Sequence, residues 1–552
     1  MKTRPALFLV FALLALAGMS ATAVAQSADQ PQVRNVIFLL TDGTGPEAWP
    51  LARWVKGEPL AVDAILTGAV QTYGADSIIT DSAPGGTAYA TGFKGTDKGL
   101  SVGAWSVTID AAASMTAPKY VPVATLLEGA RISGRAVGII ATSNVQHATP
   151  AAFSTHWHDR SNYNELAEQQ VYQNMDVVLS GGSQYLVPKG TGSGTRTDNE
   201  NLVNVLKAAG YTYITTSREL QSVQGGKVWG AFAPDAMAYD IDRAVTASTE
   251  PSLAEMTAKA VQLLSTNPKG KSNGFFLFVE GSKVDWAAHA NDPSGLVYDL
   301  LAFDDAVRVA LDFAHKDGNT LVLAVADHGT GGITVGTVSD SNYSKTDDDS
   351  IVGPMRKVRL TGEGIEKLLA GNSTEQRIRT VLAEQWGIRD LSDSELGLVQ
   401  KAMAEKKALN SVLGPILSAR ARLGWTTGGH TGADVFLYSY GPGRPTGLWQ
   451  NVDIGKLAAR GMGFDFATLN RRLFVEASSA LAGYRTYIDR TEPENPILVV
   501  SKGSARATMP LSKNLLLING RTVELEGVVV LAEKLDQVFI PRQAVDLIRS
   551  EL

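Results

Sequence analysis

Acidic residues and histidines stand together at several places where a buried strand ends or a helix begins. In the stretch VEGSKVDWAAHAND, Glu280 follows an apolar run, and Asp285 and His289 are separated by one helical turn. That spacing puts the last two side chains on one face of a helix, where both can reach one ion. The stretch ADHG places Asp327 and His328 side by side after another apolar run. Carboxylates and imidazoles grouped in this way are typical ligands of a metal site.

Two further stretches add residues of the same types. Asp42 ends the apolar run RNVIFLLTD, and His430 lies in the glycine-rich stretch TTGGHTGADV. Each feature alone has an ordinary explanation, as a surface Asp/His pair, a helix cap or a loop histidine. The chain has only seven histidines, however, and three of them fall at such positions beside acids, so the joint pattern favours a metal site. Because the chain has no cysteine, any zinc must be held by His, Asp and Glu.

A candidate nucleophile lies in the stretch TDSAPGGTAYATG, residues 80–92. Ser82 follows an acid and precedes small residues that would let backbone and substrate approach closely. The same serine could instead be the cap of an alanine-rich helix, because Ser, Thr and Asp are common helix N-caps. Thr80 is a second candidate nucleophile. This stretch alone leaves the alternatives open.

Alternating strand and helix patterns supply the framework that must position these side chains. The apolar runs typical of buried strands cover residues 34–42, 135–142, 175–182, 273–281 and 319–329. The helical stretches between them include residues 121–134, 252–265 and 296–316. This alternation predicts an α/β fold with a central, mostly parallel sheet and helices on both faces. Ligands of such sheets gather beyond the carboxyl ends of the strands, which is where the acids lie.

Two segments depart from this pattern. Residues 340–424 are charged and helical without strand runs, which predicts a helical insertion suited to a lid or a subunit contact. After about residue 484, short β-rich runs and an Asn-Gly turn predict a small appended domain. The expected organisation is a signal peptide at 1–25, a catalytic domain at 26–484 with the insertion at 340–424, and a β-rich C-terminal domain at 485–552.

The N-terminus has the three parts of an export signal. These are the basic MKTR, the apolar PALFLVFALLALAG and the small-residue cleavage site AVA at 23–25. An uncleaved anchor is the alternative, but the apolar core is short for a spanning helix, so cleavage is favoured. We therefore expect export to the periplasm or the medium, with no membrane span after cleavage.

The bulk composition excludes other classes of protein. The chain of 552 residues is 44% hydrophobic and 19% charged, which indicates an ordinary globular protein. Its formal charge of −6 and its lack of basic blocks argue against a nucleic-acid partner.

The motifs occur in an order that closely resembles the alkaline phosphatases. D-G-x-G is followed by D-S-A, by A-T-P-A-A with a later Arg, by V-E-G-x-x-x-D-x-x-x-H, by A-D-H and by H-T-G. The resemblance covers roughly residues 34–440 and continues to about 480. It implies a phosphomonoesterase with two zinc ions and one magnesium ion.

The resemblance assigns the metal ligands position by position. Its two zinc sites correspond here to Asp285, His289 and His430, and to Asp42, Asp327 and His328. Its third site corresponds to Asp42, Thr149 and Glu280. Mixed nitrogen and oxygen ligands suit zinc, whereas an all-oxygen site suits magnesium.

The resemblance also assigns the residues that meet the substrate. Ser82 matches the nucleophile, whose Oγ on a zinc ion can lose its proton near neutral pH. Arg160 matches the phosphate-binding arginine, which can hold two phosphate oxygens with its planar fork. Asp81 is expected to orient that arginine. The D-S-A frame favours Ser82 over Thr80 as the nucleophile.

Two positions beside the substrate differ from well-known bacterial members of the family. His147 stands before A-T-P where those members have Asp, and Trp286 follows Asp285 where they have Lys. Other members carry His and Trp there, so the resemblance still implies activity. The differences remove a charge partner near the magnesium and a cation near the phosphate, which leaves the third metal and the phosphate affinity open. Trp286 could also be a packing residue.

The predicted reaction is the hydrolysis of small phosphate monoesters to an alcohol and inorganic phosphate through a phosphoserine. The nearest alternative is a sister enzyme that cleaves diesters or phosphonates on the same metals, and Arg160 argues for monoesters. SAPGG only partly matches the S-x-P-x-R signature of the related sulfatases, because Gly86 stands where the arginine would be. A non-catalytic extracellular binding protein is the alternative from a different class, and the intact nucleophile and ligands argue against it. A homodimer is implied by the resemblance alone.

Overall fold

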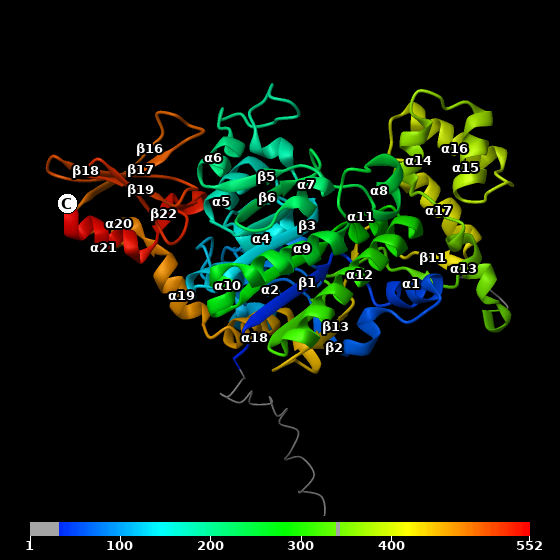
Figure 1. Cartoon of the computed structure of the whole chain (residues 1–552), viewed down its shortest axis with the longest axis horizontal. Helices are drawn as coiled ribbons and strands as arrows, with labels where there is room; N and C mark the ends of the chain where they lie inside the picture. The colour runs from blue at the N-terminus through cyan, green and yellow to red at the C-terminus, as the bar shows by residue number, and fades with distance from the viewer. Residues whose placement is uncertain (1–31, 338–342) are drawn as a thin grey trace, which may run out of the picture.

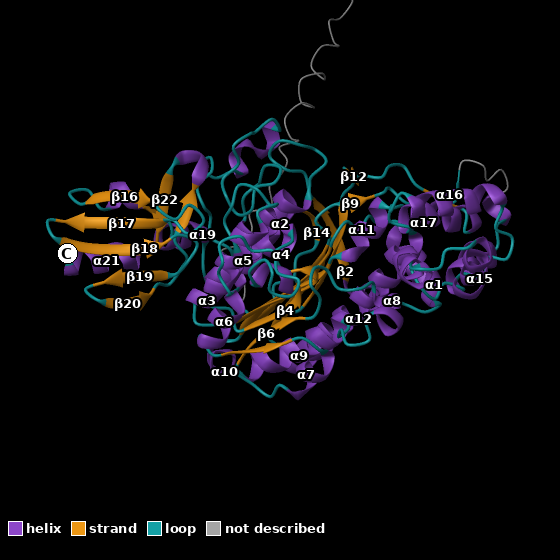
Figure 2. Cartoon of the chain, turned by 90° about the horizontal axis from the view of Figure 1, so that it is seen from above, coloured by secondary structure: helices purple, strands orange, loops and turns teal. Residues whose placement is uncertain are grey.

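A ten-stranded mixed sheet forms the centre of the molecule. The computed structural model describes residues 32–337 and 343–552, so the predicted signal peptide at 1–25 lies outside the described residues. Figure 2 shows this sheet between layers of helices. In spatial order, its strands are β14 (Gly447–Gln450), β2 (Leu66–Gln71), β13 (Val435–Tyr440), β8 (Thr320–Val325), β1 (Asn35–Thr41), β7 (Phe275–Gly281), β3 (Ala136–Asn144), β4 (Val177–Gly181), β6 (Lys227–Ala231) and β5 (Tyr211–Ile214).

The strands run in one direction apart from β13. This strand is antiparallel to both of its neighbours, β2 and β8. The remaining neighbours are paired in parallel, including the central β8, β1, β7 and β3. The carboxyl ends of the parallel strands therefore meet at one edge of the sheet. The predicted mostly parallel α/β sheet is confirmed.

Both faces of the sheet are buried, as the continuous apolar runs predict. In β1, Ile37 and Leu39 pack into one hydrophobic core, whereas Phe38 and Leu40 pack into the other. This alternation follows the two-residue period of a strand. The first core also takes in residues of α12, and the second takes in residues of α18. Helices on both faces are therefore confirmed.

The helices around the sheet fall into these two layers. Helices that contribute to the first core are α1 (Ala48–Lys56), α9 (Leu253–Thr266), α11 (Lys283–His289) and α12 (Pro293–Asp317). Helices that contribute to the second core are α2 (Ser82–Thr91), α3 (Leu126–Ile132), α4 (Ala148–Ser154), α5 (Tyr163–Tyr172), α6 (Leu202–Ala208) and α18 (Asn451–Gly461). Shorter connecting helices are α7 (Ser217–Ser222), α8 (Asp240–Thr246) and α10 (Pro268–Asn273).

The segment expected to be a helical insertion consists mainly of five helices. These are α13 (Asp348–Arg356), α14 (Gly362–Leu369), α15 (Glu375–Gln385), α16 (Asp393–Ala404) and α17 (Asn410–Arg420). They lie at one end of the molecule, drawn in yellow-green in Figure 1. Two short paired strands, β10 (Thr334–Val335) and β11 (Leu423–Gly424), close the segment at its base.

The C-terminal part is rich in antiparallel strands and lies at the opposite end (Figure 1). After α19 (Phe466–Leu473) and α20 (Ala477–Ala480), one sheet has the order β16 (Arg485–Asp489), β17 (Ile497–Lys502), β18 (Ala505–Pro510), β19 (Leu515–Ile518) and β20 (Arg521–Glu524). A second sheet joins β15 (Val475–Glu476), β22 (Gln537–Ile540) and β21 (Val530–Ala532), and α21 (Arg542–Glu551) ends the chain. Asn519 and Gly520 form the predicted turn, both with positive φ, between β19 and β20.

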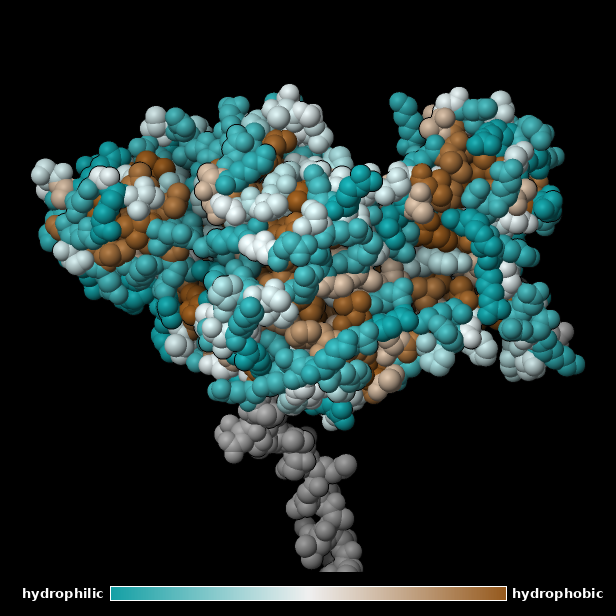
Figure 3. All heavy atoms as spheres, in the orientation of Figure 1, coloured by the Kyte–Doolittle hydropathy of each residue, from teal (hydrophilic) through white to brown (hydrophobic). Residues whose placement is uncertain are grey.

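The C-terminal sheets have a hydrophobic core of their own, which includes Leu498, Val500 and Ile548. On the face in Figure 3, hydrophilic residues cover most of the surface, and hydrophobic residues show between them in the sheets, the central unit and the insertion. Among the described residues, no helix combines the length and the apolar character needed to span a bilayer.

Candidate active site

The acids of the predicted site lie at the carboxyl ends of three adjacent strands. Asp42 follows β1, Glu280 lies near the end of β7, and Asp327 follows β8. The parallel register aligns Leu40 with Glu280 and with Val325, so the three strands end at the same level. The topology of the sheet thus brings together acids that are far apart in the sequence.

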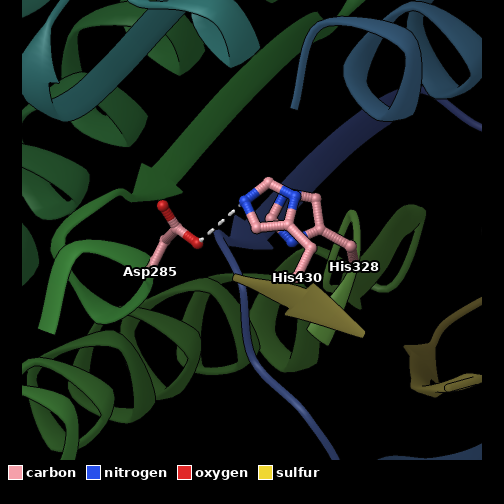
Figure 4. A group of neighbouring side chains, drawn as sticks. All are labelled: Asp285, His328 and His430. Atoms are coloured by element: carbon pink, nitrogen blue, oxygen red, sulfur yellow. Dashed lines mark ion pairs between the residues drawn. The ribbon is translucent and has the colours of Figure 1, made fainter. Parts of the chain in front are cut away.

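One group of ligand-type side chains surrounds Asp285, at the first turn of α11. Its carboxylate oxygens lie 3.4 Å from His289 Nε2 and 3.7 Å from His430 Nε2. Figure 4 shows this carboxylate facing the rings of His328 and His430. These two rings are stacked, with their centroids 3.7 Å apart. The backbone approaches Asp285 so closely that a Cβ at Gly43 would lie 2.4 Å from Asp285 Oδ1, which only glycine avoids.

The orientation of two of these imidazoles suits a shared cation. His289 Nδ1 lies 2.7 Å from the carbonyl oxygen of Gly428, and His430 Nδ1 lies 2.8 Å from that of Thr80. Because a carbonyl oxygen only accepts, each Nδ1 carries a proton, and the Nε2 atoms of the two rings are turned towards each other. The two Nε2 atoms lie 3.0 Å apart. The contact with Asp285 raises the pKa of His289 to about 9, so without a metal the protonated ring can donate from Nε2 to His430 Nε2, and a bound cation would take the place of that proton.

A second group joins Asp42, Asp327 and His328 to the candidate nucleophile. His328 Nε2 lies 3.5 Å from Asp42 Oδ1 and 3.3 Å from Asp327 Oδ2. Ser82 Oγ lies 3.2 Å from the same His328 Nε2 and 3.5 Å from Asp42 Oδ1. The backbone N–H groups of Gly43 and His328 donate to Asp327 Oδ1, which leaves Oδ2 free to face the group.

A third group has buried polar atoms without partners. Four buried oxygen atoms have no hydrogen-bond partner among the described residues, namely Asp42 Oδ2, Thr149 Oγ1 and both carboxylate oxygens of Glu280. Asp42 and Glu280 also lie near His147, close enough for the three to share one ion. Buried polar atoms in proteins are usually satisfied, so a cluster of such oxygens fits the ligand set of a cation.

The electrostatics of the site point to the same conclusion. Burial, together with the neighbouring carboxylates Asp327 and Asp285, raises the pKa of Asp42 well above its usual value. Burial, with Asp327 adding to it, raises the pKa of Glu280 to about 8. The protein alone therefore disfavours the charged form of these groups, because burial removes the water that would stabilise them. Bound cations would reverse this effect and allow the carboxylates to ionise together.

The donor set fits zinc at the first two groups. Two nitrogen ligands of one tetrahedral zinc ion, each at about 2.0–2.1 Å, lie roughly 3.4 Å apart. The observed 3.0 Å between His289 Nε2 and His430 Nε2 is close to this separation. The third group offers mainly oxygen atoms, as a magnesium site requires, but His147 adds a nitrogen.

The position of Ser82 argues against a role as an ordinary helix cap. Ser82 is the first residue of α2, and Asp81 occupies the cap position without a side-chain capping bond. The Ser82 hydroxyl is directed at His328 and Asp42 instead. The hydroxyl of Thr80 contacts the carbonyl oxygen of Asp81, 3.3 Å away. The geometry therefore favours Ser82 over Thr80 as the nucleophile.

The predicted phosphate-binding side chains lie beside Ser82. Arg160 forms an ion pair with Asp81 through Nη1, and its Nη2 lies 3.2 Å from His147 Nε2. The His147 ring in turn meets the Trp286 ring edge to face, with the centroids 5.5 Å apart. Burial, followed by the charge of Arg160, lowers the pKa of His147 to about 3, so this ring is neutral and its Nε2 can accept from the guanidinium.

The loop that carries Arg160 is fixed from behind by a buried ion pair. His156 Nε2 lies 3.1 Å from Glu128 Oε1, and both side chains are inaccessible to solvent. His156 Nδ1 lies 3.1 Å from the carbonyl oxygen of Ser101. The backbone N–H of Arg160 donates to the carbonyl oxygen of Lys98, 3.0 Å away. These bonds fix the base of the arginine side chain relative to the site.

Comparison with known proteins shows which family has this arrangement. The family model described as alkaline phosphatase matches residues 33–460. The chain belongs to the alkaline phosphatase family. Alkaline phosphatase 3 of Bacillus subtilis (strain 168) is 33% identical over 448 residues, which cover 78% of this chain and 88% of the relative. The repressible alkaline phosphatase of Saccharomyces cerevisiae is 30% identical and covers 77% of this chain and 80% of its own.

Solved structures of the same family have the same fold. The cold-active enzyme from a psychrophilic Shewanella sp. aligns with a TM-score of 0.66 at 30% identity, covering 78% of this chain and 99% of its own. The Thermus thermophilus alkaline phosphatase aligns with a TM-score of 0.68 at 27% identity, covering 79% and 93%. Family and fold support phosphomonoester hydrolysis, and this alkaline phosphatase family is metal-dependent.

The structure brings the predicted site residues into one region and adds one role that the sequence did not reveal. Thr330 Oγ1 donates to Asp285 Oδ1 at 2.6 Å and lies 3.2 Å from His328 Nδ1, so this hydroxyl links two groups of the site. Pairing of β9 (Gly329–Thr330) with β12 (His430–Thr431) places it there. In the sequence, the only signal for this role of Thr330 was its position two residues after His328. The nearness of His147 to the third group agrees with the sequence analysis, which placed this position near the magnesium, and shows that its ring can also offer a nitrogen there.

Proposed function

We propose that this chain hydrolyses phosphate monoesters through a covalent phosphoserine on Ser82, assisted by two zinc ions and one magnesium ion. The observation that carries the proposal is the position of Ser82 Oγ, 3.2 Å from His328 Nε2 and 3.5 Å from Asp42 Oδ1. The hydroxyl thus touches two ligand-type side chains at once. That position suits a nucleophile activated by a metal ion.

The residues that would hold the metals follow the three groups. One zinc would be held by Asp285, His289 and His430, the other by Asp42, Asp327 and His328, and the magnesium by Asp42, Thr149 and Glu280. When bound, the metals act as Lewis acids that favour deprotonation of a hydroxyl and stabilise charge on phosphoryl oxygens. One similar structure, a mutant of the TAB5 alkaline phosphatase, has Mg bound in its M3 site. The nitrogen of His147 beside the third group could alter the metal preference there.

The side chains of the protein have distinct parts in the reaction. Ser82 Oγ attacks phosphorus in line with the ester oxygen, a P–O bond to Ser82 forms, and the P–O bond to the leaving alcohol breaks. A water molecule then attacks the phosphoserine, which frees inorganic phosphate and returns the Ser82 hydroxyl. Arg160 holds two phosphoryl oxygens during both steps, and its ion pair with Asp81 keeps the guanidinium in place.

The geometry supports monoesters of broad structure as substrates. The side chains above address the phosphoryl group alone, and a monoester offers more free charged oxygens to Arg160 than a diester does. We further propose that the protein is exported to the periplasm or the medium and acts as a homodimer, as the resemblance implies. Small phosphomonoesters, not nucleic acids, are the proposed partners.

Metal removal tests this proposal. Prolonged chelation is expected to abolish phosphate release from an aryl phosphate and to lower the thermal midpoint, because a bound metal stabilises the native state. Zinc plus magnesium should restore both. Metal content per chain is measured alongside for Glu280→Gln, which is expected to lose the third metal. Asp453→Asn, which changes an acid of α18 outside the three groups, serves as the control and should keep all metals. Full activity of a protein verified to be metal-free would contradict the proposal.

A further inference from the structure

A second positively charged side chain, that of Lys98, lies near Arg160 in the lining of an open cavity. The cavity has a volume of about 410 Å³ and is lined by Asp81, Asp97, Lys98, Arg160, Ser161 and Tyr163. It shares Arg160 and Asp81 with the phosphate-binding part of the site, but none of the proposed metal ligands line it. A substrate held by Arg160 can therefore extend into this space.

The backbone holds Lys98 in a fixed place next to Arg160. The N–H of Arg160 donates to the carbonyl oxygen of Lys98 at 3.0 Å. Leu100, two residues after Lys98, and Trp157, three residues before Arg160, exchange two backbone hydrogen bonds of 2.8 and 3.0 Å. Lys98 itself has a φ of 66°, in the left-handed region, which is uncommon for a residue other than glycine. The segment of Lys98 and the loop of Arg160 thus form one short antiparallel ladder.

The two cations of the cavity differ in what already engages them. Arg160 is bound to Asp81 and lies near His147. Within residues 32–337 and 343–552, the Lys98 ammonium forms no ion pair within 4.0 Å and no hydrogen bond. The side chain is exposed, with Asp97 beside it in the same cavity lining. Asp159 is also within electrostatic reach, because the charge of Lys98, after the hydrogen bonds from Ser161, lowers the pKa of Asp159. Lys98 is therefore near two acids but has no direct partner among the described residues, so its ammonium can contact a ligand.

Tyr163 supplies a neutral donor on the wall of the same cavity. Its ring packs edge to face against Tyr185, with the centroids 4.8 Å apart, which fixes the direction of the side chain. In the described part of the chain, its hydroxyl forms no hydrogen bond. A phenol and an ammonium in one cavity are suitable partners for the oxygens of an anion.

We propose that Lys98 and Tyr163 form a second anion-binding position, which favours phosphomonoesters that carry another phosphate or a carboxylate. This inference rests on the proposed function, because it requires Arg160 to hold the phosphoryl group that is cleaved. The effect is modest and depends on salt, because Lys98 is exposed and Asp97 opposes an incoming anion. Asp97 therefore limits the preference for substrates with a second anionic group, and replacement of Asp97 should strengthen this preference.

A pair of substrates that differ only in the second anion tests the proposal. Propyl phosphate and propane-1,3-diyl bisphosphate share the same carbon chain, and phosphate release gives kcat/KM for each at low ionic strength. Lys98→Gln is expected to lower kcat/KM for the bisphosphate about two- to fivefold, the size of an exposed ion pair, and to leave the propyl ester nearly unchanged. Glutamine retains a side chain of similar length and the same backbone preferences, so the ladder should persist.

Three companion measurements complete the test. Lys119→Gln, which changes an exposed lysine outside the cavity lining, should leave the ratio of the two kcat/KM values unchanged. Asp97→Asn should raise the ratio of kcat/KM for the bisphosphate to kcat/KM for propyl phosphate, and Tyr163→Phe should lower this ratio. If Lys98→Gln lowers both substrates equally or changes neither, the second position is refuted and the proposed function stands. If the wild-type protein cleaves neither substrate, the proposed function itself is refuted.

Discussion

Replacement of Arg160 by alanine separates a phosphomonoesterase from a diesterase on the same metals. The guanidinium has five N–H donors. One on Nη1 is used by Asp81, and Nη2 lies 3.2 Å from His147 Nε2. Each Nη then retains one N–H for a phosphoryl oxygen. Arg160→Ala also leaves Asp81 without its partner, so that an unpaired carboxylate faces the incoming phosphate.

The expected loss follows from the donors that remain for the phosphoryl group, which are one N–H on each Nη and the Nε–H. A hydrogen bond to a charged group contributes roughly 1.5–3 kcal/mol, so one or two such bonds lost correspond to a fall of about one to four powers of ten in kcat/KM for a monoester. A diester has one fewer free oxygen and a lower charge, so its cleavage should fall much less. The preference for monoesters over diesters should therefore shrink.

Parallel kinetics on an aryl phosphate and its methyl aryl diester measure this change. Arg160→Lys keeps the charge but not the planar fork, and an intermediate loss is expected for the monoester. Arg218→Ala removes an exposed arginine elsewhere and should have no effect. Equal and small losses for both substrates in Arg160→Ala would refute the assignment of Arg160 to the phosphoryl group.

Three further predictions concern the framework of the site. Burial alone would raise the pKa of Glu128, but its histidine and glutamine partners outweigh burial and hold it at about 2, below the usual 4.5. This carboxylate thus adds stability above pH 4.5 that is lost as the pH falls towards 2, about 3 kcal/mol in all. The unfolding free energy of Glu128→Gln, measured as a function of pH, should lack this decline between pH 4.5 and 2. A decline equal to that of the wild type would contradict the stabilising role of the Glu128 carboxylate. Lys513→Met removes the ammonium 3.0 Å from the buried Glu168. Because burial raises the pKa of Glu168 to about 8, the carboxyl can take up a proton in the variant, and the loss should be roughly 1–3 kcal/mol by urea unfolding. The exposed Lys534→Met should cost little, and equal midpoints for the two variants would count against a stabilising contact. Removal of 485–552 should leave the zinc content unchanged, because every predicted ligand precedes this segment, and zinc loss from a folded product would show otherwise.

Much of the fold could be predicted from the sequence because its signals are local. The apolar runs that end in Asp42, Glu280 and Asp327 are continuous, which is typical of strands buried on both faces, and these strands lie at the centre of the sheet. The edge strands β14 and β5 and their neighbours β2 and β6 are short and less uniformly apolar, and the sequence did not distinguish them. The Asn519-Gly520 turn was predicted because its two residues tolerate positive φ.

The site could be predicted as a set of residues but not as a set of contacts. Spacing alone put Asp285 and His289 on one helical face, since i and i+4 are neighbours in any helix. The contact of Thr330 with Asp285 depends on the pairing of two-residue strands across 100 residues of intervening chain, for which the sequence has no local signal. The nearness of His147 to Asp42 and Glu280 likewise depends on how α4 packs against the sheet. The cavity at Lys98 results from a backbone ladder between two loops, which periodicity does not reveal.

The central claim is that Ser82 becomes covalently phosphorylated during turnover. The most direct measurement is to quench the enzyme with acid during steady hydrolysis of a monoester, digest it and locate the phosphate by mass spectrometry. We expect a single phosphorylated peptide, with the phosphate on Ser82, and its absence in Ser82→Ala under the same conditions. Phosphate found on Thr80, or a Ser82→Ala variant that still yields the same phosphopeptide, would contradict the account.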